Sequence, residues 1–410
     1  MLLVVVTLVA MLFGLWILPA EEQRATVAAI QARGGQVGYS VSLFGRNTDQ
    51  WLAAWIPIDY FARPFGVSHA QATDVDLSLI CRLRTLELLA FSGDEVTDIG
   101  ISQVAQLQSL ERLEFDSLRV TSEGLRQIGP LPRLRELMIR MGVFRTGNGL
   151  DMIREFPELL ELGIASPLHD SELVHVPPHP KLQTLKLVRT QITGPGLAVV
   201  RGLPALRYLI LRSSPVTDEG LKHLRGHPAL EYLDLSGTRI TYEGTASLGD
   251  LPRLRDLNLD STGVDGRGLI PFRENASLRE LSLRSIDLRD ADLSPLATMP
   301  QLNRLYLSSS INDRTLAGLA GSRALQKIDL ESAGQITGEG LLHLAAIPSL
   351  QEASIPERLE YGYGATVLRN QLPSGGLITS GDRVVFPIWS SRWPRDSPVP
   401  PSPDDPVESP

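Results

Sequence analysis

Residues 182–206 read LQTLKLVRTQITGPGLAVVRGLPAL, and the chain repeats this pattern with a period of 24 residues. Each copy opens with a leucine of the string LxxLxL, and these leucines are Leu182, Leu206, Leu230, Leu254, Leu278 and Leu302. Self-similarity at a fixed period in this range indicates a solenoid of stacked repeats. We therefore expect a binding surface rather than a catalytic pocket.

Each repeat contains two hydrophobic periodicities. LxxLxL has the period of two that turns alternate side chains to one face of a short strand, and the later GLxxLxxL half has helical spacing. One copy cannot bury its leucines alone, whereas parallel stacking closes a continuous core between strands and helices. The pattern predicts an α/β solenoid, a curved horseshoe with parallel strands on its concave face and helices on its convex face.

Cap and stop residues recur in phase with the leucines. Thr193, Thr217 and Thr241 precede the helical half, where a hydroxyl can cap free N–H groups at a helix start. Proline has no N–H and is expected to end the helix two residues before the next strand leucine. These prolines are Pro132, Pro157, Pro180, Pro204, Pro228, Pro252, Pro300 and Pro348.

The leucine frame extends outward from the regular block with looser spacing. Further strand leucines are expected at Leu83, Leu110, Leu134, Leu159, Leu325 and Leu350. We predict about 11 repeats over residues 77–355. With roughly 4.8 Å between neighbouring strands, the strand face would form an arc on the order of 50 Å long.

This pattern resembles the leucine-rich-repeat proteins. The match is to the LxxLxLxxTxITDxGLxxLxxLPxL type of ribonuclease-inhibitor-like and F-box-associated arrays, also found in bacterial membrane-anchored repeat proteins. The resemblance implies a non-enzymatic protein that binds a protein partner. At the repeat position where F-box-associated repeats have a cysteine, this chain has Thr190, Ser214, Thr238 and Thr262. That departure argues against a ubiquitin-ligase adaptor.

Composition narrows the class of partner. Hydrophobic residues make up 43% of the chain, which is enough for a long core, and the net charge is −8. A net negative charge argues against a surface that binds nucleic acid. The lone Cys81 has no cysteine with which to form an internal disulfide, and we interpret it as a small core residue.

The N-terminus carries a candidate membrane anchor. Residues 2–19 contain no charge and, as a helix, would span about 27 Å, close to the hydrocarbon thickness of a bilayer. A cleaved signal is the alternative, but Leu18-Pro19-Ala20 lacks a small-x-small cleavage site. By analogy with bacterial anchored repeat proteins, we expect a single-pass membrane protein with its repeats outside the cytoplasm.

The flanks of the array are interpreted as caps. Residues 20–76 are expected to contain an amphipathic helix from Glu21 to Ala32, a strand from Val37 to Leu43, and aromatic residues that would cover the open apolar end. Residues 356–393 would cap the other end, with a strand at 384–386. Residues 394–410 are rich in proline, serine and acid, and we predict a disordered tail.

The sequence offers no catalytic set. Two histidine pairs have a spacing that could suit a metal site on a helix, His175 with His179 and His223 with His227. Two prolines separate the first pair, and Gly226 and Pro228 place His227 in a loop, so neither pair has the required geometry. No HExxH, CxxC pair, GxSxG or P-loop string is present. We therefore expect no enzyme activity, no metal and no cofactor.

Candidate partner-binding residues flank the core leucines on the concave strand face. They are Tyr208, Arg212, Tyr232, Asp234, Asp256, Asp260, Arg284, Arg304 and Tyr306. Tyr208 and Tyr232 are expected to be in-register neighbours, and exposed tyrosine pairs are typical of interface hot spots.

The acidic part of this face has two interpretations. Asp256 and Glu280 would be adjacent like charges, which destabilise a sheet unless cations such as Arg284 and Arg304 offset them. The residues then form either a charge network that keeps the sheet soluble or a docking site for a polypeptide.

The predicted function is a membrane-anchored scaffold that binds a protein partner. The alternative is a soluble intracellular adaptor or enzyme inhibitor of the same fold, such as an F-box-like substrate receptor.

Overall fold

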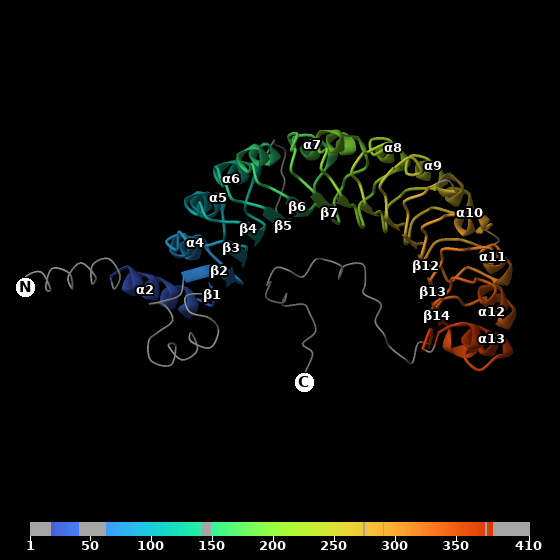
Figure 1. The fold of residues 1–410 in the computed structure, drawn as a ribbon. Coiled ribbons are helices and arrows are strands. Elements are labelled where there is room, and N and C mark those ends of the chain that lie inside the picture. The colour runs from blue at the N-terminus through green and yellow to red at the C-terminus, as the bar shows by residue number, and fades with distance from the viewer. Residues whose placement is uncertain are drawn as a thin grey trace, which may run out of the picture.

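The protein is an open arch in which strands line the inner rim and helices line the outer rim (Figure 1). The computed structural model describes residues 18–40, 63–140, 149–273, 275–289, 291–373 and 375–379. Within these residues one 15-stranded sheet runs from β1 to β15 in strict chain order. Strand β1 pairs antiparallel with β2, and every later pair is parallel. The predicted horseshoe, with strands inside and helices outside, is confirmed.

The strands are short and evenly spaced along the chain. Their bounds are β1 Gln36–Ser40, β2 Arg63–His69, β3 Leu88–Ser92, β4 Arg112–Asp116, β5 Glu136–Arg140, β6 Glu161–Ala165, β7 Thr184–Leu187, β8 Tyr208–Ile210, β9 Tyr232–Asp234, β10 Asp256–Asn258, β11 Glu280–Ser282, β12 Arg304–Tyr306, β13 Lys327–Asp329, β14 Glu352–Ile355 and β15 Leu377–Thr379.

The outer elements mix α-helices with 3₁₀ turns. The α-helices are α2 Leu18–Ala32, α4 Asp74–Ile80, α5 Asp98–Ser102, α6 Ser122–Gln127, α7 Asp170–Leu173, α8 Asp218–Leu221, α9 Tyr242–Thr245, α10 Ser294–Ala297, α11 Asp313–Ala317, α12 Gly338–Ala345 and α13 Tyr363–Gln371. The 3₁₀ elements are η3 Gln103–Gln106, η4 Gly149–Glu155, η5 Pro195–Gly202, η6 Gly266–Phe272 and η7 Glu357–Leu359. Several of the α-helices, such as α8 and α9, consist of a single turn.

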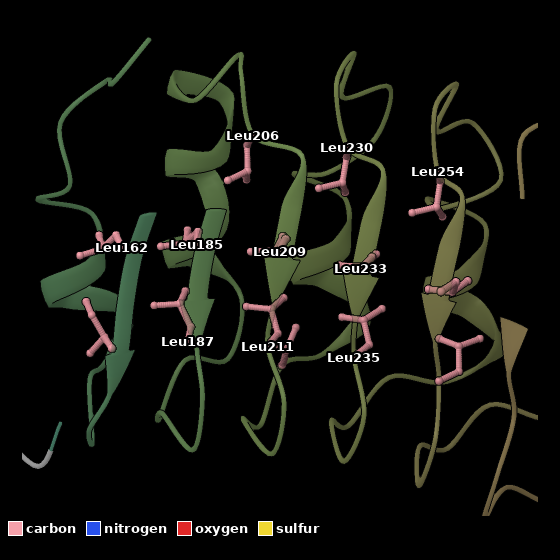
Figure 2. Close-up of a cluster of buried hydrophobic side chains, with 14 of the residues drawn as sticks. Leu162, Leu185, Leu187, Leu206, Leu209, Leu211, Leu230, Leu233, Leu235 and Leu254 are labelled. Atoms are coloured by element: carbon pink, nitrogen blue, oxygen red, sulfur yellow. The ribbon is translucent and has the colours of Figure 1, made fainter. Parts of the chain in front are cut away.

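The leucines form the core as rows that run across the strands (Figure 2). Leu185, Leu209 and Leu233 are register partners on successive strands, and each is completely buried. Burial of one leucine side chain contributes about 1.5–3 kcal/mol. Because each leucine packs mainly against the copies before and after it, stability accumulates from neighbour to neighbour.

The turn that follows each central strand repeats one backbone conformation. Arg189, Ser213, Gly237, Ser261 and Ser285 occupy equivalent places, and all have φ between 54° and 67°. This left-handed region suits glycine and costs other residues about 1 kcal/mol. Four of the five turns therefore keep a mild backbone strain that a glycine would relieve.

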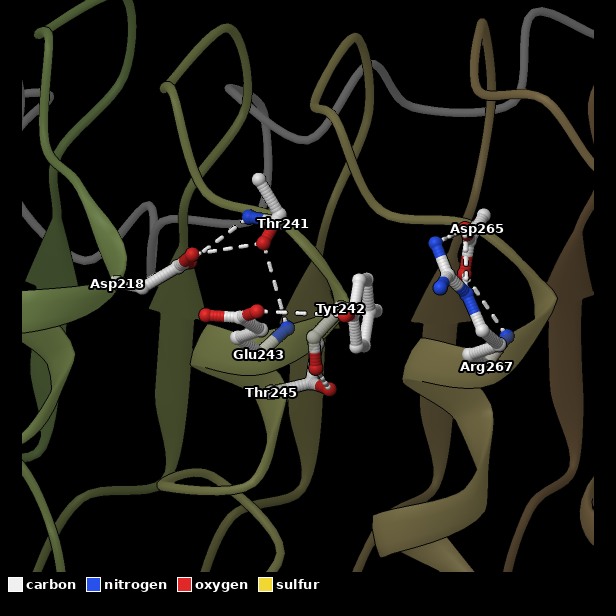
Figure 3. A network of polar contacts seen from close by, with 7 residues as sticks. All are labelled: Asp218, Thr241, Tyr242, Glu243, Thr245, Asp265 and Arg267. Carbon is white, nitrogen blue, oxygen red and sulfur yellow. Dashed lines mark hydrogen bonds and ion pairs between the residues drawn. The ribbon is translucent and has the colours of Figure 1, made fainter.

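Aspartates join successive repeats at the helix side of the array. In the pair Asp218 and Thr241, the Thr241 amide donates to Asp218 Oδ1 at 2.8 Å and its hydroxyl donates to Oδ2 at 2.7 Å (Figure 3). We call this arrangement an Asp–Thr rung. The rungs are Asp74–Thr97, Asp98–Thr121, Asp170–Thr193, Asp218–Thr241 and Asp313–Thr337.

The rungs explain why a glycine follows each rung threonine after three residues, as Gly244 follows Thr241. A Cβ atom on Gly244 would overlap the Asp218 carboxylate that binds Thr241, and Gly100, Gly124, Gly196 and Gly340 face their own rung aspartates in the same way. The glycine is therefore needed for a close approach of two repeats. This contact, rather than an unusual φ, fixes the residue type.

The rungs also change the roles expected for the cap residues. Thr241 caps α9 by accepting from the Glu243 amide, but the hydroxyl of Thr217 donates to the Thr193 carbonyl instead. The side chain of Thr193 donates to Asp170. Of the three expected threonine caps, only Thr241 accepts a helix amide, and its hydroxyl donates to Asp218 of the preceding repeat at the same time.

The first repeats differ from the expected frame in two ways. Leu86, not Leu83, is the equivalent of Leu110, because each follows the same turn into strands β3 and β4. The parallel sheet already begins at β2, and α4 crosses the expected boundary between residues 76 and 77. Helix α2, which contains the expected amphipathic stretch, is tied to α4 by an ion pair between Arg33 and Asp76.

At the other end the repeat architecture continues past residue 355. Helix α13 packs beside α12, and β15 pairs in parallel with β14. The expected strand at 384–386, the tail at 394–410, residues 2–17 of the expected anchor, and Trp51, Trp55, Tyr60 and Phe61 lie outside the described residues. Among the helices that are described, none has the length and apolar content needed to cross a membrane.

Candidate binding surface on the concave face

One column of side chains crosses the concave face at the first outward position of each strand. The register pairs Tyr208 with Tyr232, Tyr232 with Asp256, Asp256 with Glu280 and Glu280 with Arg304. The sequence-based expectation that these residues are neighbours is thus correct. Two aromatic residues, two acids and one base follow each other on five parallel strands.

The tyrosine pair forms the aromatic part of this column. The ring centroids of Tyr208 and Tyr232 are 6.0 Å apart with an interplanar angle of 39°. The Arg207 guanidinium lies 5.8 Å from the Tyr208 centroid. Burial, together with the nearby carboxylates of Asp234 and Asp256, raises the pKa of the Tyr232 phenol. The Tyr232 phenol therefore stays neutral, and the two rings present a half-buried aromatic platform.

The two adjacent acids of the column have unequal surroundings. Glu280 is 5% exposed, accepts a hydrogen bond from Arg304 at 3.1 Å and another from the Tyr306 hydroxyl at 3.3 Å. The Asp256 carboxylate makes no hydrogen bond or ion pair with a described residue. Burial and the charge of Glu280 raise the pKa of Asp256 to about 6.

Arg284 has a different partner from the one expected. Its guanidinium lies 4.6 Å from the centroid of the Tyr306 ring and forms an ion pair with Asp329 on β13. Tyr306 and Asp329 are register partners on neighbouring strands. The expectation that Arg284 offsets Asp256 and Glu280 is wrong, because Asp329 is the carboxylate within its reach.

Asp234 and Asp260 serve the fold rather than an open surface. Asp234 is 5% exposed and accepts from the Ser236 amide at 2.9 Å. Asp260 accepts from the Ser282 hydroxyl at 2.6 Å and the Arg284 amide at 2.7 Å, and burial raises its pKa. These two carboxylates satisfy backbone donors at the end of the strands, so they are removed from the set of partner contacts.

Arg212 is the exposed cation of the predicted set. It follows β8, and its guanidinium makes no hydrogen bond or ion pair with a described residue, although its charge acts on Tyr232. Its guanidinium therefore stands beside the tyrosine platform and opposite in charge to Asp256. The structure brings together Tyr208, Arg212, Tyr232 and Asp256 as the open part of the face.

Elsewhere the same face is a network of cross-strand ion pairs. Arg112 meets Glu136 at 3.1 Å, Lys186 meets Glu161 at 2.5 Å, and Lys327 pairs with Glu352. Exposed pairs of this kind contribute about 0–1 kcal/mol each, but they neutralise adjacent charges on a parallel sheet. The charge-network interpretation therefore applies to both ends of the face, and the centre differs.

The histidines form links between repeats. His179 Nε2 lies 3.1 Å from the Phe156 carbonyl oxygen, and His227 Nε2 lies 3.1 Å from that of Leu203. Burial lowers the pKa of His227, which favours the neutral ring. No group of three or more histidine, cysteine or carboxylate side chains in the described part of the chain is arranged to hold a metal ion.

Two residues of the site were missed in the sequence-based set. Glu280 was recognised as a neighbour but left out of the set, and Asp329 was not considered. Asp329 could have been found by following the column of Tyr306 one strand further. The Asp–Thr rungs were also missed, although a threonine followed at once by aspartate and two residues later by glycine recurs in the sequence at Thr97 and Thr217.

Comparisons with known proteins agree with this geometry. A family model described as Leucine Rich repeat matches residues 227–249. An internalin from Listeria monocytogenes, inlF, has a similar structure with a TM-score of 0.51 at 19% identity, covering 75% of this chain and 94% of its own. The TLR13–ssRNA13 complex matches with a TM-score of 0.51 at 19% identity, covering 70% of this chain and 41% of the other. No curated protein matches the chain.

The repeat, the arch and the family match together define a leucine-rich-repeat protein. Proteins of this class typically act as interaction scaffolds rather than enzymes, and their folds generally mediate contacts between proteins. The concave centre of this chain is the place where such a contact can be sought.

Proposed function

We propose that the protein is a non-enzymatic scaffold, anchored in a membrane by its N-terminus, whose concave strand face binds a polypeptide partner. The observation that carries the binding part is the change of character at the centre of the concave face. Towards the ends of the face many charges are paired across strands, whereas the centre combines a tyrosine platform with the guanidinium of Arg212 and the carboxylate of Asp256, neither of which pairs with a described residue. Aromatic residues and arginine are the side chains most enriched in interface hot spots.

A protein partner fits the charge of this surface better than a nucleic acid does. The TLR13 structure contains a single-stranded RNA, so the fold by itself does not select the class of ligand. Here the net charge is −8, and Asp256 and Glu280 stand side by side on the candidate surface. Phosphate backbones are repelled by such a surface and require clusters of lysine and arginine.

The anchor rests on the uncharged stretch 2–19, whose length matches a bilayer. We place the repeats on the extracytoplasmic side, by analogy with bacterial anchored repeat proteins. A carbonate wash of membranes that contain the full-length protein tests the anchor, and retention in the pellet is the expected result. Release by carbonate would favour the soluble adaptor. Protease digestion of intact cells, then of cells with opened outer layers, then of lysed cells, assigns the side.

The binding surface is tested with a matched pair of double variants. Tyr208→Ala/Tyr232→Ala removes the platform, and Tyr361→Ala/Tyr363→Ala removes two tyrosines that are 88% and 77% exposed near α13. Partners are captured by proximity crosslinking in cells and quantified by mass spectrometry. We expect the platform variant to lose at least about tenfold of a specific partner signal, since buried hot-spot truncation costs 2 kcal/mol or more. Equal loss in both variants would contradict the proposed surface.

A further inference from the structure

On the described part of the concave face, one arginine is held between a tyrosine and an aspartate. Arg284 stacks 4.6 Å from the Tyr306 centroid and pairs with Asp329, and these two residues are register partners on β12 and β13. A guanidinium is suited to this place because it is planar, stacks on an aromatic face and donates in a fork to a carboxylate.

The same pair of residue types occurs three strands earlier without a completing cation. Tyr232 and Asp256 are register partners on β9 and β10, so the tyrosine again precedes the aspartate by one strand. Unlike Asp329, Asp256 forms no ion pair with a described residue. The carboxylate is nevertheless half-buried beside the aromatic platform.

Three arginines act on Asp256 through their charge, and none of them forms an ion pair with it. Arg255 pairs with Glu231 at 3.3 Å, and Arg304 pairs with Glu280 at 3.1 Å. Arg279 affects Asp256 only through its charge. The Asp256 carboxylate is partly desolvated, lies beside a second acid and accepts no hydrogen bond from a described residue. An added cation would therefore stabilise its charged form.

We propose that Tyr232 and Asp256 form a receptor site for an arginine side chain of the bound polypeptide, with Tyr208 extending the aromatic wall. This inference rests on the proposed function, since it names the partner chemistry of the same surface. The incoming guanidinium stacks on the Tyr232 ring and donates hydrogen bonds to the Asp256 carboxylate, as Arg284 does at Tyr306 and Asp329. Lysine fits less well, because its ammonium is a compact charge without the planar fork.

The site has a defined pH response. The groups that face Asp256 are Tyr232 on β9, Glu280 on β11, Arg304 on β12 and the arginines at 255 and 279. Asp256, whose pKa is raised to about 6 by burial and by the neighbouring charge of Glu280, gains a proton as the pH falls through that value. Arginine binding is therefore strong above pH 6 and weakens as the pH falls below it.

The test uses a random dodecapeptide phage library as the probe, selected on the full-length protein. Parallel selections use Asp256→Asn, Tyr232→Ala and, as a matched control, Asp250→Asn, whose carboxylate is exposed and pairs with Arg225. We expect peptides selected by the wild type and by Asp250→Asn to be enriched in arginine on the order of fivefold over those selected by the other two variants. Asp256→Asn removes an unfavourable charge and is expected to fold, which circular dichroism checks.

The best selected peptide is then measured by calorimetry at pH 5 and pH 8, with its arginine replaced by citrulline or lysine. We expect citrulline, a neutral isostere, to weaken binding at pH 8 by about 10- to 100-fold. The pH dependence should disappear in Asp256→Asn. Enrichment of lysine instead of arginine, or binding unaffected by citrulline, would overturn the inference.

The outcomes also separate this inference from the proposed function. Peptides that need Tyr208 and Tyr232 but carry no arginine preference would overturn the arginine site and leave the concave binding surface standing. Peptides indifferent to every concave variant, or a library that yields no binder, would contradict both.

Discussion

Asp170 and Asp256 are both half-buried aspartates of the same repeat array, yet their surroundings are opposite. Asp170 lies on the helix side and accepts hydrogen bonds from Thr193 and from two glycine amides of the next repeat. Burial alone would raise its pKa, but these donors outweigh burial and lower it. Asp256 lies on the concave face without a donor, and its pKa is raised to about 6. A carboxylate that the array satisfies is structural, and one that it leaves unsatisfied is available to a partner.

The largest expected change in stability comes from removing the aspartate whose carboxylate is fully hydrogen-bonded. Asp170→Ala removes four hydrogen bonds and leaves the amides of the buried Gly194 and Gly196 unpaired, so we expect a loss of about 2–4 kcal/mol in unfolding free energy at pH 7. Because the folded pKa is lowered, this stabilisation is present above the pKa of the unfolded state and disappears as the pH falls through the folded pKa. Urea titrations of wild type and variant at pH 7 and pH 3 measure the difference.

The control for that variant is Asp250→Ala, which breaks an exposed ion pair with Arg225. We expect a change within about 0.5 kcal/mol. A loss as large as that of Asp170→Ala would show that any aspartate of the outer face matters equally, and the rungs would then have no special role.

A second prediction tests whether a rung and its glycine act as one unit. Gly244→Ala places a Cβ against the Asp218 carboxylate, so we expect a loss of roughly 1–3 kcal/mol. Asp218→Ala should cost about as much through its two lost hydrogen bonds. In the double variant the clash is gone and alanine favours the helix, so its loss should be smaller than the sum. Additive losses in a double-mutant cycle would contradict this account.

A third prediction concerns the unsatisfied side. Asp256 has a folded pKa of about 6, above the unfolded value of 3.8, so the folded state takes up a proton between these values and stability falls as the pH rises through them. Asp256→Asn should therefore raise the unfolding free energy by roughly 1–2 kcal/mol at pH 8 and by almost nothing at pH 3.5. Thermal melts across this range give the profile, and a variant less stable at pH 8 would contradict it.

The smallest expected effect comes from the turns between the two sides. Ser261→Gly places the residue best suited to φ 54° in the turn after β10, and we expect a gain of a few tenths to about 1 kcal/mol. Gly237→Ser, at the equivalent turn with φ 67°, should lose a similar amount. Opposite signs in the two melting temperatures would support the repeated turn, and equal signs would contradict it.

The fold could be predicted from the sequence because its causes are periodic. Leu209 and Leu233 occupy the same position in successive repeats, so a single argument about burial applies to the leucine at this position in each repeat. The register of the concave column followed from the same spacing, which is why Tyr208 and Tyr232 were placed correctly as neighbours. Periodicity fixes which strand positions are adjacent.

The contacts made by long polar side chains could not be predicted in this way. Asp234 and Asp260 share outward strand positions with surface residues, but they turn back to backbone donors. Arg284 reaches past its neighbour to Asp329 because its stem spans a strand. Such choices depend on side-chain length and on competing donors nearby, and the repeat period contains no information about either.

The rungs are unevenly distributed along the arch. Rungs join the repeats at Asp74 and Asp98, but the three junctions between Thr241 and Asn312 have none among the described residues, and Arg267 stacked 3.7 Å from the Tyr242 ring is a side-chain link there. This segment lies behind Asp256 and Glu280. The repeats behind the candidate binding surface are therefore joined on the helix side by backbone bridges, Thr241 with Gly263 and Asp265 with Asp287, and by ring stacking, in place of the carboxylate rungs that join the first repeats.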